Sequence, residues 1–310
     1  MTLTTILWFD QVFQGDVAPA MSLAVAFRGH EGIVLAADSR VTMMVPQPAQ
    51  IIPGAPAGAP MMVPIYPTYF DNAHKLLSFR GQPFVGIVTF GAGAIGQQEP
   101  RTVQGYLPEF EAHLTGVAGI DAATGAQLRL TTLQVAQELE TFFNAQWSAG
   151  GMPPAPLTPG VQPLTFLVGG YDDGEPYGHI YELSIPNNIV PQEKLPFAPT
   201  FGGMNELMAR LLNGFDPRAL ELTKNYLSLD DTQVAALRGI RDQNLSLQIP
   251  YQFLPLQDCV DLSVAIISMT IQIQSWMFGI RGVGGEIDVA TISREDGLKH
   301  VYQKVIKVRD

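Results

Sequence analysis

The stretch that most constrains the fold is residues 22–40, SLAVAFRGHEGIVLAADSR. Its first half alternates large apolar residues with alanines, which is the two-residue period of a β-strand with two different faces. Its second half, from Gly32 to Ala37, is apolar at every position, as in a strand that is covered on both faces. Gly29 and Gly32 lie between the halves and favour a tight turn. The stretch therefore predicts a buried β-hairpin.

The second strand of this hairpin runs directly into Asp38, Ser39 and Arg40. Burying an unpaired carboxylate is costly in free energy. We therefore expect Asp38 either to lie at the exposed end of its strand or to be held in place by partners.

This strand-turn-strand-Asp-Ser-Arg pattern resembles the N-terminal hairpin of proteasome β-type subunits and bacterial proteasome-like peptidases, which belong to the N-terminal-nucleophile hydrolase superfamily. In that family the nucleophile is the first residue of the first strand, and removal of a propeptide exposes it. The resemblance implies that Ser22 is the nucleophile, that Asp38 is the family's buried aspartate, and that residues 1–21 are the propeptide. The residues themselves leave a second interpretation open, in which 1–21 remain attached as an extra strand or lid.

Further site residues come from the same resemblance. Lys75, which opens an apolar run, matches the family's lysine that reaches back to the nucleophile. Gly91 and Ala92 match a small-residue turn whose backbone N–H groups form an oxyanion hole. We expect Arg40 to be a structural partner of Asp38 or of nearby carbonyl groups.

The resemblance also implies a mechanism. A hydroxyl group is a weak nucleophile and needs a base beside it. The freed α-amine of Ser22, with a reference pKa of about 8, would accept the hydroxyl proton directly or through water. Lys75 would favour the neutral amine, Asp38 would hold Lys75, and the turn at Gly91 and Ala92 would stabilise the oxyanion. The implied reaction is peptide-bond hydrolysis through an acyl-enzyme.

Four departures from the family pattern keep a second function open. Ser22 stands where threonine is usual, and Met21 precedes it where glycine is usual. Gly202 stands where a supporting serine is usual, and residues 279–283 lack the family's aspartate and second serine. The alternative is a catalytically inactive structural subunit that retains its N-terminal segment. A nucleophile at Thr2 fits less well, because Thr2 lies far ahead of the strand that the motif requires.

The remaining elements can be predicted from periodicity and turn signals. Thr131 and Gln134 form a capping-box pair that opens a helix. Further predictions are helices near 100–115 and 258–278, a helix opened by 201–203, extra helical material over 216–255, and strand pairs at 163–170 with 178–184 and 286–292 with 299–308. With the resemblance, this order implies an α+β fold, the four-layer αββα sandwich of the N-terminal-nucleophile hydrolase type.

The predicted organisation is an N-terminal extension or propeptide over 1–21 and a single domain over 22–310, with insertions near 43–68 and 216–255. The first insertion is rich in proline, alanine and methionine. Because proline removes backbone donors, we expect this insertion to be irregular and to lie against a surface or neighbour.

Composition narrows the choice of partners. Only 15% of residues are charged, the net charge is −11, and no run of Lys and Arg occurs, so nucleic acid is not an expected partner. So few charges favour a surface that is covered by other subunits. The expected partners are further copies or related subunits in a ring, a peptide or unfolded-protein substrate, and an ATPase unfoldase.

One cysteine, Cys259, allows no intrachain disulfide and reads as a small core residue in a reducing compartment. The N-terminus lacks a secretory-signal pattern, so the expected location is the cytoplasm. Residues 262–280 carry no formal charge but include polar side chains, which favours a buried or interface helix over a membrane span. Asp172 and Asp173 read as turn residues, and we expect neither metal nor cofactor.

Overall fold

The computed structural model describes residues 22–46, 65–158, 161–204, 206–216 and 218–305. Its strands form two five-stranded sheets and a two-stranded ribbon, with antiparallel pairing throughout. The first sheet has the order β10 (Pro199–Gly203), β1 (Leu23–Arg28), β2 (Ile33–Asp38), β11 (Ile287–Ser293) and β12 (Gly297–Tyr302). The second has the order β5 (Leu76–Phe79), β6 (Gln82–Gly91), β7 (Leu164–Gly170), β8 (His179–Ile185) and β9 (Asn188–Glu193).

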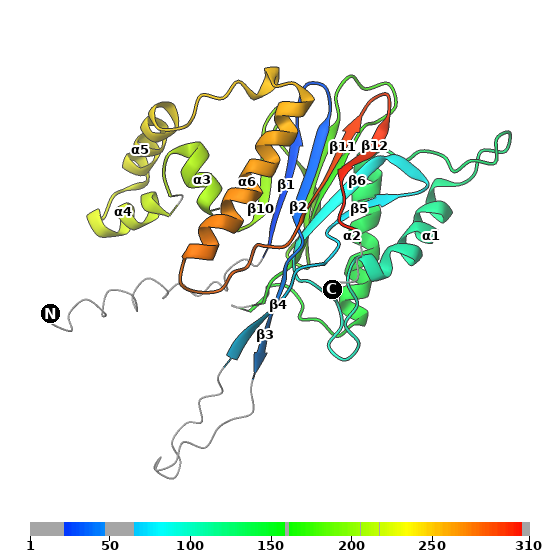
Figure 1. Cartoon of the computed structure of the whole chain (residues 1–310), viewed down its shortest axis with the longest axis horizontal. Helices are drawn as coiled ribbons and strands as arrows, with labels where there is room; N and C mark the ends of the chain where they lie inside the picture. Colours follow the sequence, from blue (N-terminus) through cyan, green and yellow to red (C-terminus); the bar gives the residue numbers. More distant parts are fainter. Residues whose placement is uncertain (1–21, 47–64, 159–160, 205, 217, 306–310) are drawn as a thin grey trace, which may run out of the picture.

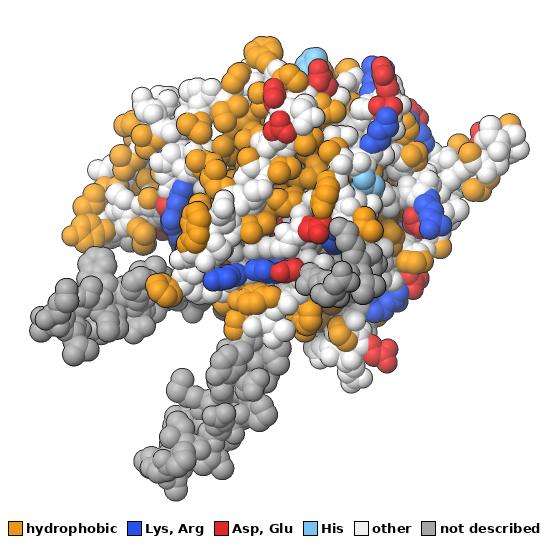
Figure 2. All heavy atoms as spheres, viewed as in Figure 1, with side chains coloured by type: hydrophobic (Ala, Val, Ile, Leu, Met, Phe, Trp, Pro, Cys, Tyr) orange, Lys and Arg blue, Asp and Glu red, His pale blue; other side chains and the backbone are white. Residues whose placement is uncertain are grey.

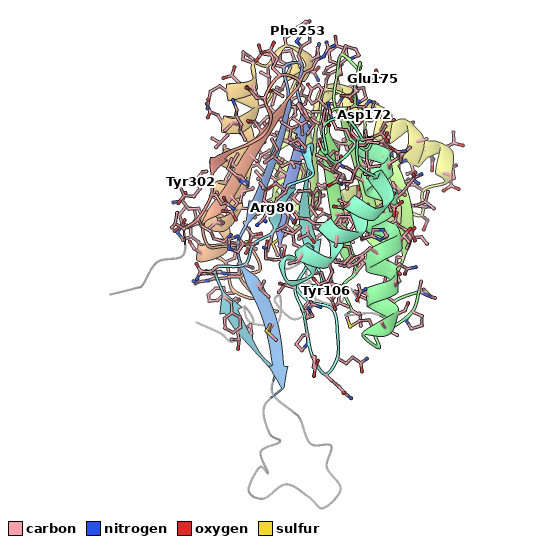
Figure 3. All side chains as sticks on the ribbon, turned by 90° about the vertical axis from the view of Figure 1, so that its right-hand side faces the viewer. Arg80, Tyr106, Asp172, Glu175, Phe253 and Tyr302 are labelled. Atoms are coloured by element: carbon pink, nitrogen blue, oxygen red, sulfur yellow. The ribbon has the colours of Figure 1, made fainter. Side chains whose placement is uncertain are left out.

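Helices lie on the outer faces of the two sheets (Figure 1). The helices of the described residues are α1 (Leu107–Ala118), α2 (Thr132–Ala149), α3 (Glu206–Asn213), α4 (Ala219–Leu227), α5 (Asp231–Asn244) and α6 (Leu256–Trp276), with short 3-10 turns at Gln104–Tyr106 and Tyr251–Phe253. The ribbon of β3 (Val41–Pro46) and β4 (Ile65–Phe70) extends away from both sheets (Figures 1 and 3).

Three apolar clusters hold these layers together. The first packs α1 and α2 against the second sheet, through Phe110, Phe143, Trp147, Phe166 and Ile87. The second packs α3 and α6 against the first sheet, through Met208, Ile266, Ile267, Phe27 and Val34. The third lies between the two sheets and includes Ala24, Leu35, Val88, Leu167 and Ala290. Each sheet therefore has helices on one face and the other sheet on its opposite face, and the predicted mixed α and β class with antiparallel sheets is confirmed.

Small residues permit the close approach of the two sheets. Side chains on a strand alternate between its faces, and the inward positions of β1 are Ala24 and Ala26. At Gly86 in β6, a side chain would overlap Leu298 of β12. The alternation of alanine with larger residues in the first hairpin is thus a packing requirement of the interface between the sheets.

One prediction about local structure was wrong. Residues 201–203 do not open a helix but lie in β10, which pairs with β1, and α3 begins only at Glu206. Pairing with a distant strand therefore fixes a glycine-rich stretch that resembles a helix start. The helix expected near 100–115 is present, although it begins at Leu107 after a 3-10 turn.

The two expected insertions contain regular structure. The ends of the 43–68 stretch pair as the β3–β4 ribbon, contrary to the irregular structure expected for it, while residues 47–64 lie outside the described residues. The 216–255 stretch contains α4 and α5, and Asp230 caps α5 through a capping box with Gln233. The domain limits themselves stay a prediction.

The apolar segment near 258–278 is helical, as predicted. Helix α6 is long and apolar enough to span a membrane by length and composition. One face of α6 packs on the first sheet, and this face carries Cys259, Ser263, Ile267 and Gln274. Cys259 is fully buried, and burial raises the pKa of its thiol to about 11.

Candidate functional site

Strand register brings the first two site residues together. Ser22 directly precedes β1, and Asp38 ends β2. Because β1 and β2 are antiparallel and Ala24 pairs with Ala37, the start of β1 lies beside the end of β2. Both side chains are buried, since Ser22 is 5% exposed and Asp38 is 1% exposed. The hairpin that the sequence predicts therefore places the hydroxyl and the carboxylate at one end of the first sheet.

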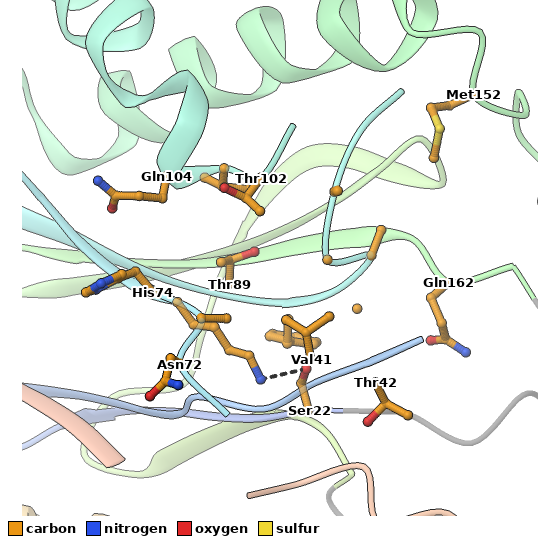
Figure 4. A pocket seen from close by; sticks show the side chains of 18 of the residues that line it. Ser22, Val41, Thr42, Asn72, His74, Thr89, Thr102, Gln104, Met152 and Gln162 are labelled. Carbon is orange, nitrogen blue, oxygen red and sulfur yellow. Dashed lines mark hydrogen bonds between the residues drawn. The ribbon is translucent and has the colours of Figure 1, made fainter. Parts of the chain in front are cut away.

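Lys75 joins these two side chains from the other sheet. It precedes β5, and its Nζ donates to Ser22 Oγ at 2.9 Å (Figure 4) and to Asp38 Oδ1 at 2.8 Å. Burial lowers the pKa of Lys75, and the negative charge of Asp38 opposes that shift. Lys75 thus contacts both of the other residues predicted to be catalytic, and the chemical roles of the three stay a prediction.

The Asp38 carboxylate is held by backbone groups as well as by Lys75. Oδ1 accepts the Leu23 N–H at 2.9 Å, and Oδ2 accepts the N–H groups of Arg40 at 3.1 Å and Gly284 at 3.0 Å. Three N–H donors and one ammonium therefore surround a carboxylate that is shielded from water. Of the two environments considered for Asp38, the structure has the one in which partners hold it.

Arg40 supports the site through a different carboxylate. Its guanidinium makes a bidentate contact with Asp71, from Nε at 2.6 Å and from Nη2 at 2.8 Å, and this contact raises the pKa of Arg40. Nη1 donates to the Arg281 carbonyl oxygen at 3.3 Å, and the guanidinium lies over the Tyr69 ring. Arg40 was expected to be a partner of Asp38 or of nearby carbonyl groups. Its side chain contacts a carbonyl oxygen, as expected, whereas only its backbone N–H contacts Asp38, because Asp71 binds the guanidinium.

Ser22 and Lys75 line a cavity of about 470 Å³, whereas Asp38 lies behind them. Figure 4 shows the labelled side chains around it, with Ser22 and Lys75 joined by a hydrogen bond. Its walls come from the first hairpin and the ribbon (Ser22, Val41, Thr42), the segment before β5 (Asn72, Ala73, His74, Lys75), the end of β6 and the turn after it (Thr89, Phe90, Gly91, Ala92, Gly93, Ala94), and more distant segments (Thr102, Val103, Gln104, Met152, Val161, Gln162). The lining is mainly apolar and includes several hydroxyl and amide side chains, as is usual for a small-molecule or peptide-sized cavity.

The N–H group of one of the two expected oxyanion donors already has a partner in the structure. Gly91 and Ala92 line the cavity, but the Ala92 N–H donates to the Pro163 carbonyl oxygen at 2.8 Å. Ala92 could act as a donor to substrate only by giving up this bond. Gly93 also lines the cavity, and within the described residues its N–H donates no hydrogen bond. The sequence analysis did not single out Gly93 as a possible oxyanion donor. The only sequence signal for it is the Gly-Ala-Gly turn in which it lies.

Gly202 has a packing explanation. It lies in β10 beside β1, and a side chain at this position would overlap the ring of Phe90. The aromatic ring therefore occupies the space that a serine side chain would need. The sequence showed that the supporting serine was lacking but not what replaces it.

The aspartates considered for a metal act in local structure. Asp172 accepts both the backbone N–H and the hydroxyl of Thr132 at the start of α2, at 2.6 Å each. Asp173 pairs with Arg129. In the part of the chain that the structure describes, no group of three or more His, Cys, Asp or Glu side chains could hold a metal ion. His74, on the cavity wall, has a pKa that burial lowers.

Comparisons with known proteins do not support the expected family. No family model matches the chain, and no curated protein matches it. A solved structure of the Anbu (Gly-1) mutant from Hyphomicrobium sp. strain MC1, a proteasome-like protein, aligns over 90% of this chain and 87% of its own, at 16% identity and a TM-score of 0.48. Similarity at this level does not bear on the activity of the chain. These comparisons therefore contradict the expectation that the chain is a member of the proteasome β-type family. The hairpin motif alone does not establish that membership.

Proposed function

We propose that this protein is a serine-type peptidase whose nucleophile, Ser22, becomes the N-terminus when residues 1–21 are removed. The observation that carries the proposal is the contact of Lys75 Nζ with both Ser22 Oγ, at 2.9 Å, and Asp38 Oδ1, at 2.8 Å, at the wall of a cavity. A nucleophile, a nitrogen base and a carboxylate that orients the base form the arrangement that activates a hydroxyl.

The burial of Lys75 suits it to this chemistry. A lysine accepts a proton only in its neutral form, and burial shifts Lys75 toward that form. Ser22 Oγ would attack the carbonyl carbon of a peptide, with its proton passing to the freed α-amine or to Lys75. The Gly93 N–H, on the cavity wall, is available to the oxyanion that forms. The proton then passes to the departing amine, and water hydrolyses the serine ester.

The same groups could remove the N-terminal segment. While Met21 is attached, the Ser22 nitrogen is an amide and cannot accept a proton. Lys75 is then the base within hydrogen-bonding distance of Ser22 Oγ. Attack of that oxygen on the Met21 carbonyl carbon would break the bond between residues 21 and 22 and form an ester, which water would hydrolyse. One geometry would therefore serve both maturation and turnover.

We further propose that the layered arrangement is the four-layer αββα sandwich of N-terminal-nucleophile hydrolases, and that copies of the chain assemble into a ring. Apolar side chains gather over the face formed by α3 to α6 (Figure 2). Tyr226 in α4 is 89% exposed, Trp276 at the end of α6 is 75% exposed, and Phe278, just beyond α6, is 89% exposed. Exposed apolar surface of this kind marks protein contacts. Sedimentation that shows only a monomer at micromolar concentration would refute the ring. A cytoplasmic location and an ATPase unfoldase partner belong to the same proposal.

A catalytically silent structural subunit is the second candidate. The observation that favours it is the Phe90 ring beside Gly202, which leaves no side chain there to support a terminal amine. In this alternative the Lys75 and Asp38 contacts would serve only to stabilise the hairpin, and residues 1–21 would remain attached.

Intact mass of the purified protein, with and without Ser22→Ala, separates the two candidates. The proposed peptidase loses residues 1–21 in the wild type and retains them in the variant. Full-length mass in both proteins would refute self-processing at Ser22 and would support the silent subunit. Ser22→Thr is the matched control, because it keeps the hydroxyl and should restore cleavage.

A further inference from the structure

A second buried lysine–aspartate pair lies close to the candidate site. The Lys304 ammonium pairs with Asp288 Oδ2, and the Lys304 backbone N–H donates to Asp288 Oδ1 at 2.9 Å. The two side chains are only 4% and 3% exposed. Buried ion pairs contribute little net stability, because desolvation offsets the attraction between the charges. The location of this pair relative to the candidate site is therefore of more interest than its contribution to stability.

Strand register places Asp288 beside the site. Asp288 in β11 pairs with Ala37 in β2, the residue before Asp38. Ala290 faces the space between the two sheets, so Asp288, two residues earlier in the same strand, faces it as well. Lys304 follows β12 and returns to this carboxylate. The pair is therefore buried at the edge of the space between the sheets from which Lys75 reaches Ser22.

Electrostatic effects connect this pair with the cavity wall. His74, which lines the cavity, feels the positive charge of Lys304 and the negative charge of Asp288. Lys75, the next residue, also feels the positive charge of Lys304. Two ammonium groups in one poorly solvated region repel each other more strongly than they would in water.

We propose that Lys304, fixed by Asp288, is a positioning residue that keeps Lys75 ready to accept the Ser22 proton. It does so by placing a second positive charge near Lys75, which disfavours the ammonium form of Lys75. The role rests on the proposed function of Ser22 and Lys75, and it gives the segment after β12 a part in tuning the site.

The charges that face Lys75 predict the sign of the effect. Asp38, at the end of β2, favours the ammonium form, whereas Arg40, just beyond β2, and Lys304, beyond β12, disfavour it. His74 carries no charge in its neutral form, so it then has little effect on the pKa of Lys75. Replacing Lys304 with methionine removes one repelling charge and leaves Asp288 without its partner. Both changes favour the ammonium form of Lys75, so its pKa rises.

The test uses four variants of the full-length chain. Lys304→Met removes the charge, and Lys304→Arg keeps it. Lys304→Met/Asp288→Asn removes the charge without leaving a buried carboxylate unpaired, so it covers the case in which Lys304→Met does not fold. Lys299→Met is the matched control, because Lys299 lies in β12 and makes an exposed pair with Asp296. It changes the net charge equally, but at a site screened by water.

The first measurement is the titration of the Lys75 ¹³Cε resonance in lysine-labelled protein carrying Ser22→Ala, assigned with Lys75→Arg. This measurement does not need an active protein, so its result does not depend on whether the proposed function is correct. Lys304→Met should raise the pKa of Lys75 by about one unit. The double variant should raise it by less, because it also removes the negative charge of Asp288. Lys304→Arg and Lys299→Met should leave it unchanged. An unchanged pKa in the double variant, or an equal shift in Lys299→Met, would overturn the proposal.

The second measurement is the pH profile of kcat/KM for peptide hydrolysis in proteins with an intact Ser22. The acidic limb should move up by the same amount, which is about a tenfold loss of kcat/KM on that limb. A purely structural role would lower kcat/KM by the same factor at every pH. A shifted Lys75 titration in a protein that cleaves no peptide would support the link to Lys304 and reject the peptidase.

Discussion

Replacing Asp38 with asparagine tests the network around the candidate site. The two side chains have nearly the same shape, but the carboxylate has two acceptor oxygens, whereas the amide has one acceptor and one donor group. Asp38 Oδ1 accepts from Lys75 and Leu23, and Oδ2 accepts from the N–H groups of Arg40 and Gly284. Every orientation of asparagine therefore turns an NH₂ group toward two donors.

The magnitude follows from the number of donors that lose their acceptor. The better orientation keeps the amide oxygen toward Lys75, so the N–H groups of Arg40 and Gly284 are left unpaired in a buried site. A buried donor without an acceptor costs about 1–3 kcal/mol, so the two together cost roughly 2–6 kcal/mol of unfolding free energy. Such a loss is a large part of the stability of a typical domain, about 5–15 kcal/mol. The change should also slow cleavage after Met21, because Lys75 keeps an oxygen acceptor but loses the negative charge that holds it in place.

Denaturant unfolding measures this effect. We would compare Asp38→Asn with its parent in the Ser22→Ala background, so that both chains keep residues 1–21, and at equal protein concentration. Asp296→Asn is the control, because Asp296 makes an exposed pair with Lys299 and should change stability by about 0.5 kcal/mol or less. A loss below about 1 kcal/mol for Asp38→Asn, with an unchanged denaturant slope, would refute the hydrogen-bond network described for Asp38.

Three further outcomes follow from the structure. The Cys259 thiol, with a pKa raised to about 11 from 9.0, keeps its proton in the folded state between these values while the unfolded state loses it. Stability should therefore fall as pH rises from 9.0 to about 11, and Cys259→Ala should remove this part of the slope in pH-dependent unfolding. Gly202→Ser should lower Tm because its side chain overlaps Phe90, and adding Phe90→Ala should recover part of the loss; an unchanged Tm in the single variant would contradict the packing described. Arg40→Lys keeps the charge but loses the bidentate contact with Asp71, so Tm should fall by a few degrees, as a thermal melt would show.

The first hairpin could be predicted because its information is local. The alternation from Leu23 onward, the glycines of the turn and the charged residues after Ala37 specify two strands and their pairing. That pairing alone brings Ser22 to Asp38. Lys75 was different: only its resemblance to a family motif singled it out, although that family assignment did not stand. Its contact with Ser22 is nonetheless present.

The parts that could not be predicted depend on backbone groups or on distant partners. Glycines carry no side-chain signal, yet Gly93 lines the cavity and the Gly284 N–H binds Asp38. Asp71 is an ordinary aspartate in the sequence, and only the fold brings it to Arg40. Residues 201–203 resemble a helix start, but Gly202 is needed where β10 passes Phe90, and Gly203 is needed for its positive φ beside the Ser22 carbonyl group.

The backbone contacts of Ser22 bear on the choice between a peptidase and a silent subunit. Its carbonyl oxygen accepts the Met204 N–H at 2.7 Å, and the following amide, that of Leu23, donates to Asp38 at 2.9 Å. Among the described residues, the Ser22 nitrogen donates no hydrogen bond. The residue is therefore held on its carboxyl side, and cutting the preceding peptide bond would leave β1 and its register intact. A nucleophile that is exposed by cleavage must be held in place from its carboxyl side, and the contacts of Ser22 with Met204 and of Leu23 with Asp38 meet this requirement of the proposed function.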